Sequence, residues 1–138
     1  MKKQIILYLW QLPQHLLALV LWLTLKLSGK IKRVDGNDFW DERVVRIENN
    51  FGVSLGNYIF LNVNCSNVVL QHERGHHKQS LMFGPIYLLA VGIPSAVFCK
   101  LWDDLFHKNW TDRKRSQWYY NRYPEKWADK LGGVKRDS

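Results

Sequence analysis

Residues 66–83 read SNVVLQHERGHHKQSLMF and are followed directly by Gly84 and Pro85. Ser66 or Asn67 can cap a helix, and a Gly-Pro pair ends one. The sequence therefore predicts a single helix over residues 66–83.

The helix carries the pattern HExxH, present here as His72-Glu73-Arg74-Gly75-His76. Residues four apart in an α-helix lie on the same face, so both imidazoles can reach one metal ion. Glu73 lies beside that face, where its carboxylate can take a proton from a zinc-bound water. The pattern predicts a zinc site with His72 and His76 as ligands and Glu73 as general base. The alternative is a solvated, charged helix face whose histidines have no function.

A catalytic zinc site takes three protein ligands and leaves one position open. Downstream, Glu125 and Asp129 stand four apart, in a stretch where Pro124 suits the first turn of a helix and Gly132-Gly133 its end. Both carboxylates then lie on one helix face. Such a pair is common by itself, but together with HExxH it indicates one shared site.

HExxH followed by ExxxD resembles the gluzincin pattern of zinc metallopeptidases. The resemblance implies that Glu125 is the third ligand to Zn²⁺ and that Asp129 hydrogen-bonds the outer nitrogen of a ligating histidine. It also implies a minimal zincin-like core that hydrolyses peptide bonds through Glu73 and a zinc-bound water.

The chain also resembles membrane gluzincins, such as prenyl-protein endopeptidases and bacterial heat-shock membrane proteases, which place a membrane hairpin between the two motifs. It is similar as well to a group of small bacterial zincin-like membrane proteins. That likeness rests on an SLGNYIFLN-type strand, an HExGHxxQS helix, a GPxYL…GxPS segment and a terminal EKWADKLGGV, which here span Ser54–Asn62, His72–Ser80, Gly84–Ser95 and Glu125–Val134. It implies a shared architecture and a location at the bacterial inner membrane.

Apolar residues gather in two blocks, and the first covers residues 4–27. At 1.5 Å per residue it is long enough to span a bilayer, and no small-residue cleavage site follows it, so we expect a membrane anchor. Polar groups at such depth face protein instead of lipid, so we expect a kink near Pro13 that turns Gln11, Gln14 and His15 inward. An amphipathic helix lying in the interface is the alternative.

The second apolar block, residues 85–102, breaks midway at Gly92-Ile93-Pro94-Ser95. A single crossing of the membrane would leave Glu125 on the opposite side from the HExxH helix. We therefore expect a re-entrant helical hairpin that turns at this break, which is tolerated where protein covers the irregular backbone. The alternative is a continuous Pro-kinked helix, which would defeat the zinc hypothesis.

Residues 40–62 are predicted to form strands separated by the turn residues Asn49-Asn50-Phe51-Gly52 and Gly56-Asn57, and residues 103–134 are predicted to form C-terminal helices that carry the third ligand. In zinc peptidases of this shape, an edge strand beside the motif helix pairs with the substrate backbone. The candidate strand here consists of Tyr58, Ile59, Phe60 and Leu61; an ordinary sheet edge is the alternative. The expected fold class is α+β, mainly helical, with a small antiparallel sheet in one domain over residues 1–138.

The net charge of +8 suits either nucleic acid or anionic lipid. No nucleic-acid-binding module is recognisable, and the apolar blocks are flanked by Trp and Tyr, so we expect membrane lipid and a peptide or protein substrate as partners. The basic stretch Lys26–Arg33 predicts that the site lies on the cytoplasmic side. Cys65 and Cys99 stand alone and indicate neither a thiol zinc site nor a disulfide framework.

These patterns predict a membrane-associated zinc metallopeptidase. Two alternatives remain: a zincin-like protein that binds zinc or a protein partner without catalysis, and a membrane-surface structural protein with a chance motif. Peptide hydrolysis also needs a group that stabilises the oxyanion. The sequence offers several without selecting one: His107, Tyr119, Tyr120, Arg122 and Tyr123.

Overall fold

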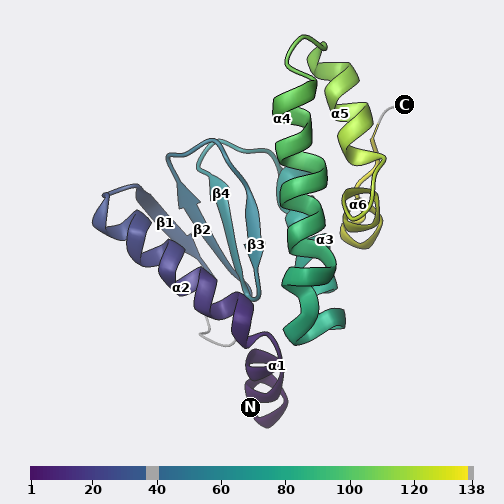
Figure 1. Ribbon diagram of the computed structural model, residues 1–138. Helices are drawn as coiled ribbons and strands as arrows, with labels where there is room; N and C mark the ends of the chain where they lie inside the picture. Colours follow the sequence, from purple (N-terminus) through teal and green to yellow (C-terminus); the bar gives the residue numbers. More distant parts are fainter. Residues whose placement is uncertain (37–40, 137–138) are drawn as a thin grey trace.

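The computed structural model describes residues 1–36 and 41–136. The helices are α1 (Lys2–Trp10), α2 (Leu12–Leu27), α3 (Asn67–Phe83), α4 (Trp102–Phe106), α5 (Asp112–Tyr120) and α6 (Glu125–Gly132), with η1 (Gly84–Ile86), η2 (Leu88–Gly92) and η3 (Pro94–Leu101) between α3 and α4. The strands are β1 (Ile31–Asp35), β2 (Arg43–Ile47), β3 (Val53–Leu55) and β4 (Tyr58–Asn62). The expected α+β, mainly helical class is confirmed (Figure 1).

The strands form one mixed sheet in the order β1-β2-β4-β3. β2 and β4 run parallel, whereas β1 with β2 and β3 with β4 run antiparallel. The expected antiparallel sheet is therefore wrong. A tight hairpin joins β3 to β4, and Gly56 supplies its left-handed φ of 64°. Because β3 takes the outer position, β4 inserts beside β2 in the same direction. β1 lies outside the predicted strand region, since its residues are mostly charged.

Successive residues of the central strands point to opposite faces of the sheet, and each face is covered by one helix. The face towards α2 buries a cluster made of Ala18, Leu25, Val45, Ile47 and Phe60. The opposite face buries Val44, Ile59 and Leu61, against which Val69 and Leu70 of α3 pack. The sheet thus fixes α3, the helix that carries HExxH.

The expected kink near Pro13 is confirmed, because the first apolar block forms the two helices α1 and α2 instead of one. The membrane anchor expected over residues 4–27 stays a prediction. Within the described residues, no single helix combines the length and hydropathy of a membrane crossing; α1 and α2 meet both criteria only as a pair, bent by 79°. The bend lies at Gln11, before Pro13, because a proline is accommodated in the first turn of α2 where its missing N–H is not needed.

The polar side chains of this block point inward, as expected. Gln11 donates to Oδ1 of Asn57 and accepts a hydrogen bond from Ser80. Gln14 donates to the carbonyl of Gly84. The ring of His15 donates from Nδ1 to the carbonyl of Tyr8 and accepts the backbone N–H of Asn57 at Nε2. These bonds join the bend to α3 and to the β3–β4 turn.

The second apolar block is a continuous helix from η1 to α4, so the predicted re-entrant hairpin is wrong. Ile93, at the expected break, has helical φ and ψ of −64° and −49°. Much of the segment has the wider turns of a π-helix. The chain reverses after residue 106 instead, and α5 returns beside α4, where Arg115 hydrogen-bonds Asp103 at 2.7 Å (Figure 1).

Because of these wide turns, every fourth residue from Tyr87 to His107 lies on the same side of the helix. The members of this four-residue repeat are Tyr87, Val91, Ser95, Cys99, Asp103 and His107, all buried or half-buried. Four residues of an α-helix turn through about 400°, so such a repeat would drift by roughly 40° per step. π-type turns, with more residues each, offset that drift. One helix can therefore present the whole repeat to the interior.

Candidate metal centre

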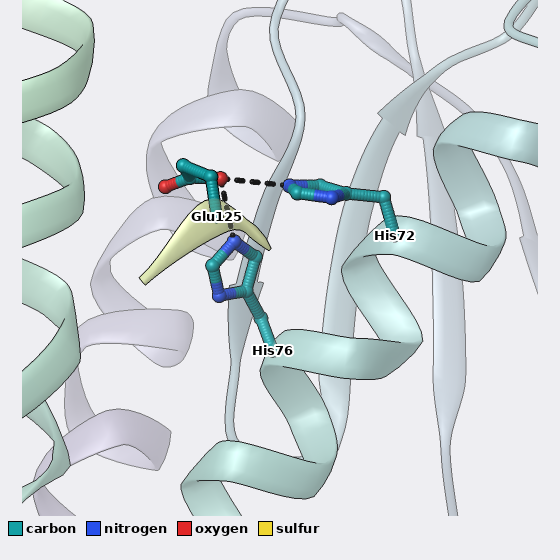
Figure 2. A group of neighbouring side chains, drawn as sticks. All are labelled: His72, His76 and Glu125. Carbon is teal, nitrogen blue, oxygen red and sulfur yellow. Dashed lines mark hydrogen bonds and ion pairs between the residues drawn. The ribbon is translucent and has the colours of Figure 1, made fainter. Parts of the chain in front are cut away.

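Three potential ligand atoms from two helices converge on one point. Nε2 of His72 lies 2.8 Å, and Nε2 of His76 lies 3.1 Å, from Oε2 of Glu125 (Figure 2). The three ligand atoms lie within 4.8 Å of one another, and all three side chains are buried. The two imidazoles lie on successive turns of α3, and Glu125 is the first residue of α6. The four-residue spacing of the histidines therefore places both rings on one helix face, as the sequence predicts.

α6 reaches α3 because two glycines keep side chains out of the helix contact. A Cβ on Gly75 would lie 1.8 Å from the backbone oxygen of Ala128, and one on Gly132 would lie 1.9 Å from that of Gln71. Non-bonded carbon contacts are favourable at roughly 3.5–4.0 Å, so a side chain at either position would push the helices apart. Gly75, inside the motif itself, therefore allows Glu125 to reach both imidazoles.

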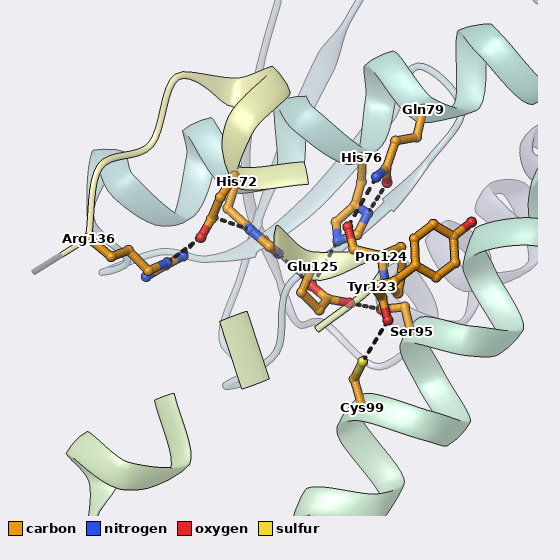
Figure 3. Close-up of polar contacts among 10 residues, drawn as sticks. His72, His76, Gln79, Ser95, Cys99, Tyr123, Pro124, Glu125 and Arg136 are labelled. Atoms are coloured by element: carbon orange, nitrogen blue, oxygen red, sulfur yellow. Dashed lines mark hydrogen bonds and ion pairs between the residues drawn. The ribbon is translucent and has the colours of Figure 1, made fainter. Parts of the chain in front are cut away.

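The outer nitrogen of each imidazole is held by an acceptor, which fixes the tautomer. Nδ1–H of His72 donates to Oδ1 of Asp129 at 2.7 Å, the bond that the resemblance implies. Nδ1–H of His76 donates to Oε1 of Gln79 at 2.7 Å; the Gln79 amide is oriented by its own bond to the Pro124 carbonyl (Figure 3). When the rings are neutral, both Nε2 atoms therefore carry the lone pair that a metal requires.

Glu125 is held from a further side by Ser95 of η3, whose hydroxyl donates to Oε1 (Figure 3). With Oε1 engaged there, Oε2 is the oxygen that faces the two imidazoles. Ser95 belongs to the four-residue repeat described above. Ser95 and Gln79 have no site role among the sequence-based predictions; the four-residue spacing from Tyr87 to His107 is a signal that could have identified Ser95.

The donor set fits a zinc ion. Histidine nitrogens and carboxylate oxygens bind zinc at about 2.0–2.2 Å, and tetrahedral ligands at that distance lie roughly 3.4 Å from one another. The 2.8 and 3.1 Å separations between Glu125 and the imidazoles are shorter than this, and the three ligand atoms lie within 4.8 Å of one another. Ion binding would therefore require the carboxylate and the imidazoles to shift by about 1 Å or less relative to one another. Two imidazoles and one carboxylate are also the ligand set of one class of catalytic zinc site.

The pKa values of His72, His76 and Glu125 are shifted because the three buried groups interact with one another. Burial alone would lower the pKa of His72, but its hydrogen bonds to Asp129 and Glu125 outweigh burial and raise that pKa to about 9. The pKa of His76 is raised by the same competition, in which Glu125 is the main partner. Burial would raise the pKa of Glu125, yet the two histidines hold it well below its usual range. The carboxylate is therefore ionised at neutral pH.

Glu73 is buried beside the histidines, and its Oε2 atom has no hydrogen-bond partner among the described residues. The other carboxylate oxygen of Glu73, Oε1, lies close to Gly52, since a Cβ added to Gly52 would lie 3.2 Å from it. Burial raises the pKa of Glu73, opposed by His76 and His72. A buried carboxylate with an unpaired oxygen and a raised pKa suits the transfer of a proton.

A cleft of about 1010 Å³ gives access to these residues from between α2, β3, the η2–η3 segment and α5. Two of the expected oxyanion-stabilising candidates, Tyr119 and Tyr120, line it, and so does Tyr87, which the sequence analysis does not include. Burial raises the pKa of Tyr87 and of Tyr119, so both hydroxyls are protonated and can donate. The other candidates, His107, Arg122 and Tyr123, do not line the cleft.

The strand that borders the cleft differs from the predicted one. Tyr58–Leu61 lies in β4, whose backbone pairs with β2 on one side and β3 on the other, so it is not an edge strand. The edge is β3, and Val53, Ser54 and Leu55 all line the cleft. A tight turn joins β3 to β4, and the sequence did not indicate which of these two strands would lie at the edge of the sheet.

Comparison with known proteins gives no match: no family model, curated protein or solved structure matches this chain. The functional interpretation therefore rests on the site itself.

Proposed function

We propose that this protein is a zinc-dependent metallopeptidase in which His72, His76 and Glu125 hold Zn²⁺. The main support is the convergence of their three buried ligand atoms within 4.8 Å, although Glu125 lies 49 or more residues after the two histidines in the sequence. A second support is that the outer nitrogen of each imidazole is occupied, so both rings turn Nε2 towards the shared carboxylate. The gluzincin-like spacing of the two motifs agrees with this arrangement.

Several groups at the cleft then have a role. A zinc ion bound there supplies Lewis acidity and lowers the pKa of a bound water. Glu73 accepts the proton of the attacking water and returns it to the leaving amine. Tyr87 and Tyr119 are the hydroxyl donors for the developing oxyanion. The open edge of β3 can align an extended peptide by strand addition.

We further propose that the protein associates with membrane lipid through apolar helix faces that lie in the interface. Large apolar side chains are exposed on both sides of the cleft: on α1 and α2 they include Ile6, Leu9, Leu16, Leu19 and Val20, and on the η2–α4 segment Leu89, Ile93, Phe98, Leu105 and Phe106. Exposed apolar area of this kind marks an interaction surface, and the net charge of +8 favours anionic headgroups. Peptide or protein substrates at the membrane surface follow from this placement.

The proposal is tested by measuring zinc content and peptide hydrolysis together. The wild type is expected to bind one equivalent of zinc, and the His72→Ala/His76→Ala variant none. Glu73→Gln should keep the zinc and lose hydrolysis of a fluorogenic peptide library. His77→Ala is the matched control: this histidine stands on α3, but its Nδ1 hydrogen-bonds the carbonyl of Gly56, away from the site.

Equal zinc content in the wild type and the double variant would overturn the metal site. Zinc binding without hydrolysis of any peptide, in detergent and in vesicles, would leave a zinc-binding protein and overturn the peptidase. For the membrane proposal, Leu89→Glu should weaken flotation with vesicles that contain anionic lipid; unchanged flotation would contradict it.

A further inference from the structure

Arg136 lies next to the proposed metal centre although it follows the last helix. Gly133 ends α6 with a left-handed φ of 73°, and the N–H of Val134 bonds back to the carbonyl of Asp129. This cap turns the chain back along the helix. The guanidinium of Arg136 thereby meets the carboxylate of Asp129 in a two-point contact, with Nε 2.5 Å from Oδ2 and Nη2 3.0 Å from Oδ1.

Asp129 and Tyr120 both connect Arg136 to His72. Oδ1 of Asp129, one of the two oxygens held by Arg136, also accepts Nδ1–H of His72 at 2.7 Å. The Arg136 guanidinium stacks 3.3 Å from the centroid of the Tyr120 ring, and that ring lies edge-on to His72 with centroids 5.1 Å apart. Two of the groups that contact the His72 ring are therefore held by the same arginine.

The two-point geometry matters because a carboxylate with one partner can rotate. Among the described residues, the carboxylate of Asp129 hydrogen-bonds only His72 and Arg136. A planar guanidinium that engages both oxygens locks the carboxylate plane, which a single-point ammonium does not do. With that plane locked, the direction of the His72 Nδ1–H bond is set, and Nε2 at the opposite end of the ring stays aimed at Glu125.

We infer that Arg136 is a positioning residue of the proposed zinc centre, which acts through Asp129 and Tyr120 to hold the His72 ring in its ligating orientation. The inference rests on the proposed function. It assigns a role in metal affinity to a residue outside both sequence motifs. Groups that orient a ligating histidine typically change metal affinity 10–100-fold when they are removed.

The test compares Arg136→Gln, Arg136→Lys and the neighbouring control Lys135→Gln. Zinc affinity is measured by competition with a chromophoric chelator. Arg136→Gln should bind zinc about 10–100-fold more weakly, Arg136→Lys should recover part of the loss, and Lys135→Gln should match the wild type. The absorption bands of the Co²⁺-substituted protein should change in Arg136→Gln and remain in Lys135→Gln. Equal zinc affinity for Arg136→Gln and Lys135→Gln, with unchanged cobalt bands, would overturn the inference.

A metal-free measurement separates this inference from the proposed function. In the protein stripped of metal, imidazole ¹⁵N NMR should show a protected Nδ1–H on His72 that is lost in Arg136→Gln. If the wild type binds no zinc, the proposed function fails, while this signal still decides whether Arg136 orients His72. Retention of the signal in Arg136→Gln overturns the inference whether or not zinc binds. Should Arg136→Gln fail to fold, Arg136→Lys carries both measurements, with a smaller loss expected.

Discussion

Replacement of Gly75 by alanine tests whether the close approach of α6 to α3 builds the site. The new Cβ would lie 1.8 Å from the backbone oxygen of Ala128 and 2.5 Å from its carbonyl carbon. Because contacts of this kind need more than 3 Å, the helices must separate by roughly 1.5 Å. Metal–ligand distances tolerate only about 0.2 Å. Glu125, at the start of α6, would therefore be lost as a ligand, and zinc affinity should fall by at least about 100-fold.

The sign of the stability change in Gly75→Ala shows whether helix propensity or the clash with α6 dominates. Helix propensity alone would stabilise the variant by about 1 kcal/mol. Overpacking against backbone costs about 1–3 kcal/mol, and this clash is at the severe end of that range. We expect a net loss of about 1–2 kcal/mol, which lowers Tm by roughly 3–8 °C in a chain of this size.

The zinc affinity is measured by chelator competition, and Tm by thermal unfolding of the same preparations. Gly132→Ala should behave like Gly75→Ala, because its Cβ would meet the backbone of Gln71 at 1.9 Å. Gly92→Ala is the matched control, since its Cβ meets the Leu88 side chain at an ordinary 3.4 Å. If Gly75→Ala binds zinc as tightly as Gly92→Ala and is at least as stable, then the argument from the helix contact is refuted.

Three further predictions follow from the structure. Burial lowers the pKa of His15 to about 4, so its ring is neutral in the fold; the groups that face it are Tyr8, Tyr58 and His77. A depressed histidine pKa gives stability that is fully present above about pH 6.5 and is lost as the pH falls towards 4, here about 2 kcal/mol. Urea unfolding at pH 7 and 4.5 should show this loss in the wild type, and His15→Gln should lose less; equal losses would contradict the assignment. Ser95→Ala removes the hydroxyl bond to Glu125 and should weaken zinc binding about tenfold without loss of the fold, whereas an unchanged chelator titration would show that the bond does not orient the carboxylate. Zinc at 100 times its Kd should stabilise the protein by about 2.7 kcal/mol, reversed by a chelator and absent from His72→Ala/His76→Ala; the same shift in that variant would place the zinc elsewhere.

The sequence was sufficient to predict which residues share a helix face, because this depends only on their short spacing along the chain. His72 with His76, and Glu125 with Asp129, are each four apart, and helical geometry alone puts each pair on one face. The inward direction of Gln11, Gln14 and His15 likewise follows from the cost of unpaired polar groups in an apolar segment.

The sequence failed where distant segments had to be placed. The order of β3 and β4 depends on which strand meets β2, which no local pattern encodes. The predicted hairpin at Gly92-Ile93-Pro94-Ser95 came from the assumption that only a reversal inside the apolar block could return Glu125 to the histidines. The reversal between α4 and α5 achieves this through a loop that carries no apolar signal. Arg136 was missed because it reaches Asp129 only through the cap at Gly133.

The bend between α1 and α2 bears on how the protein can be divided. Removal of hydrophobic N-terminal segments is a common route to soluble fragments, and it assumes that the segment is a tether. Here α2 forms one wall of the molecule, and its loss would bare Val45, Ile47 and Phe60 on one side of the sheet. It would also remove Gln11, which hydrogen-bonds the side chains of Asn57 and Ser80. A fragment that begins at residue 28 should therefore aggregate, and the helices that carry the proposed metal centre cannot be separated from the hydrophobic N-terminal segment.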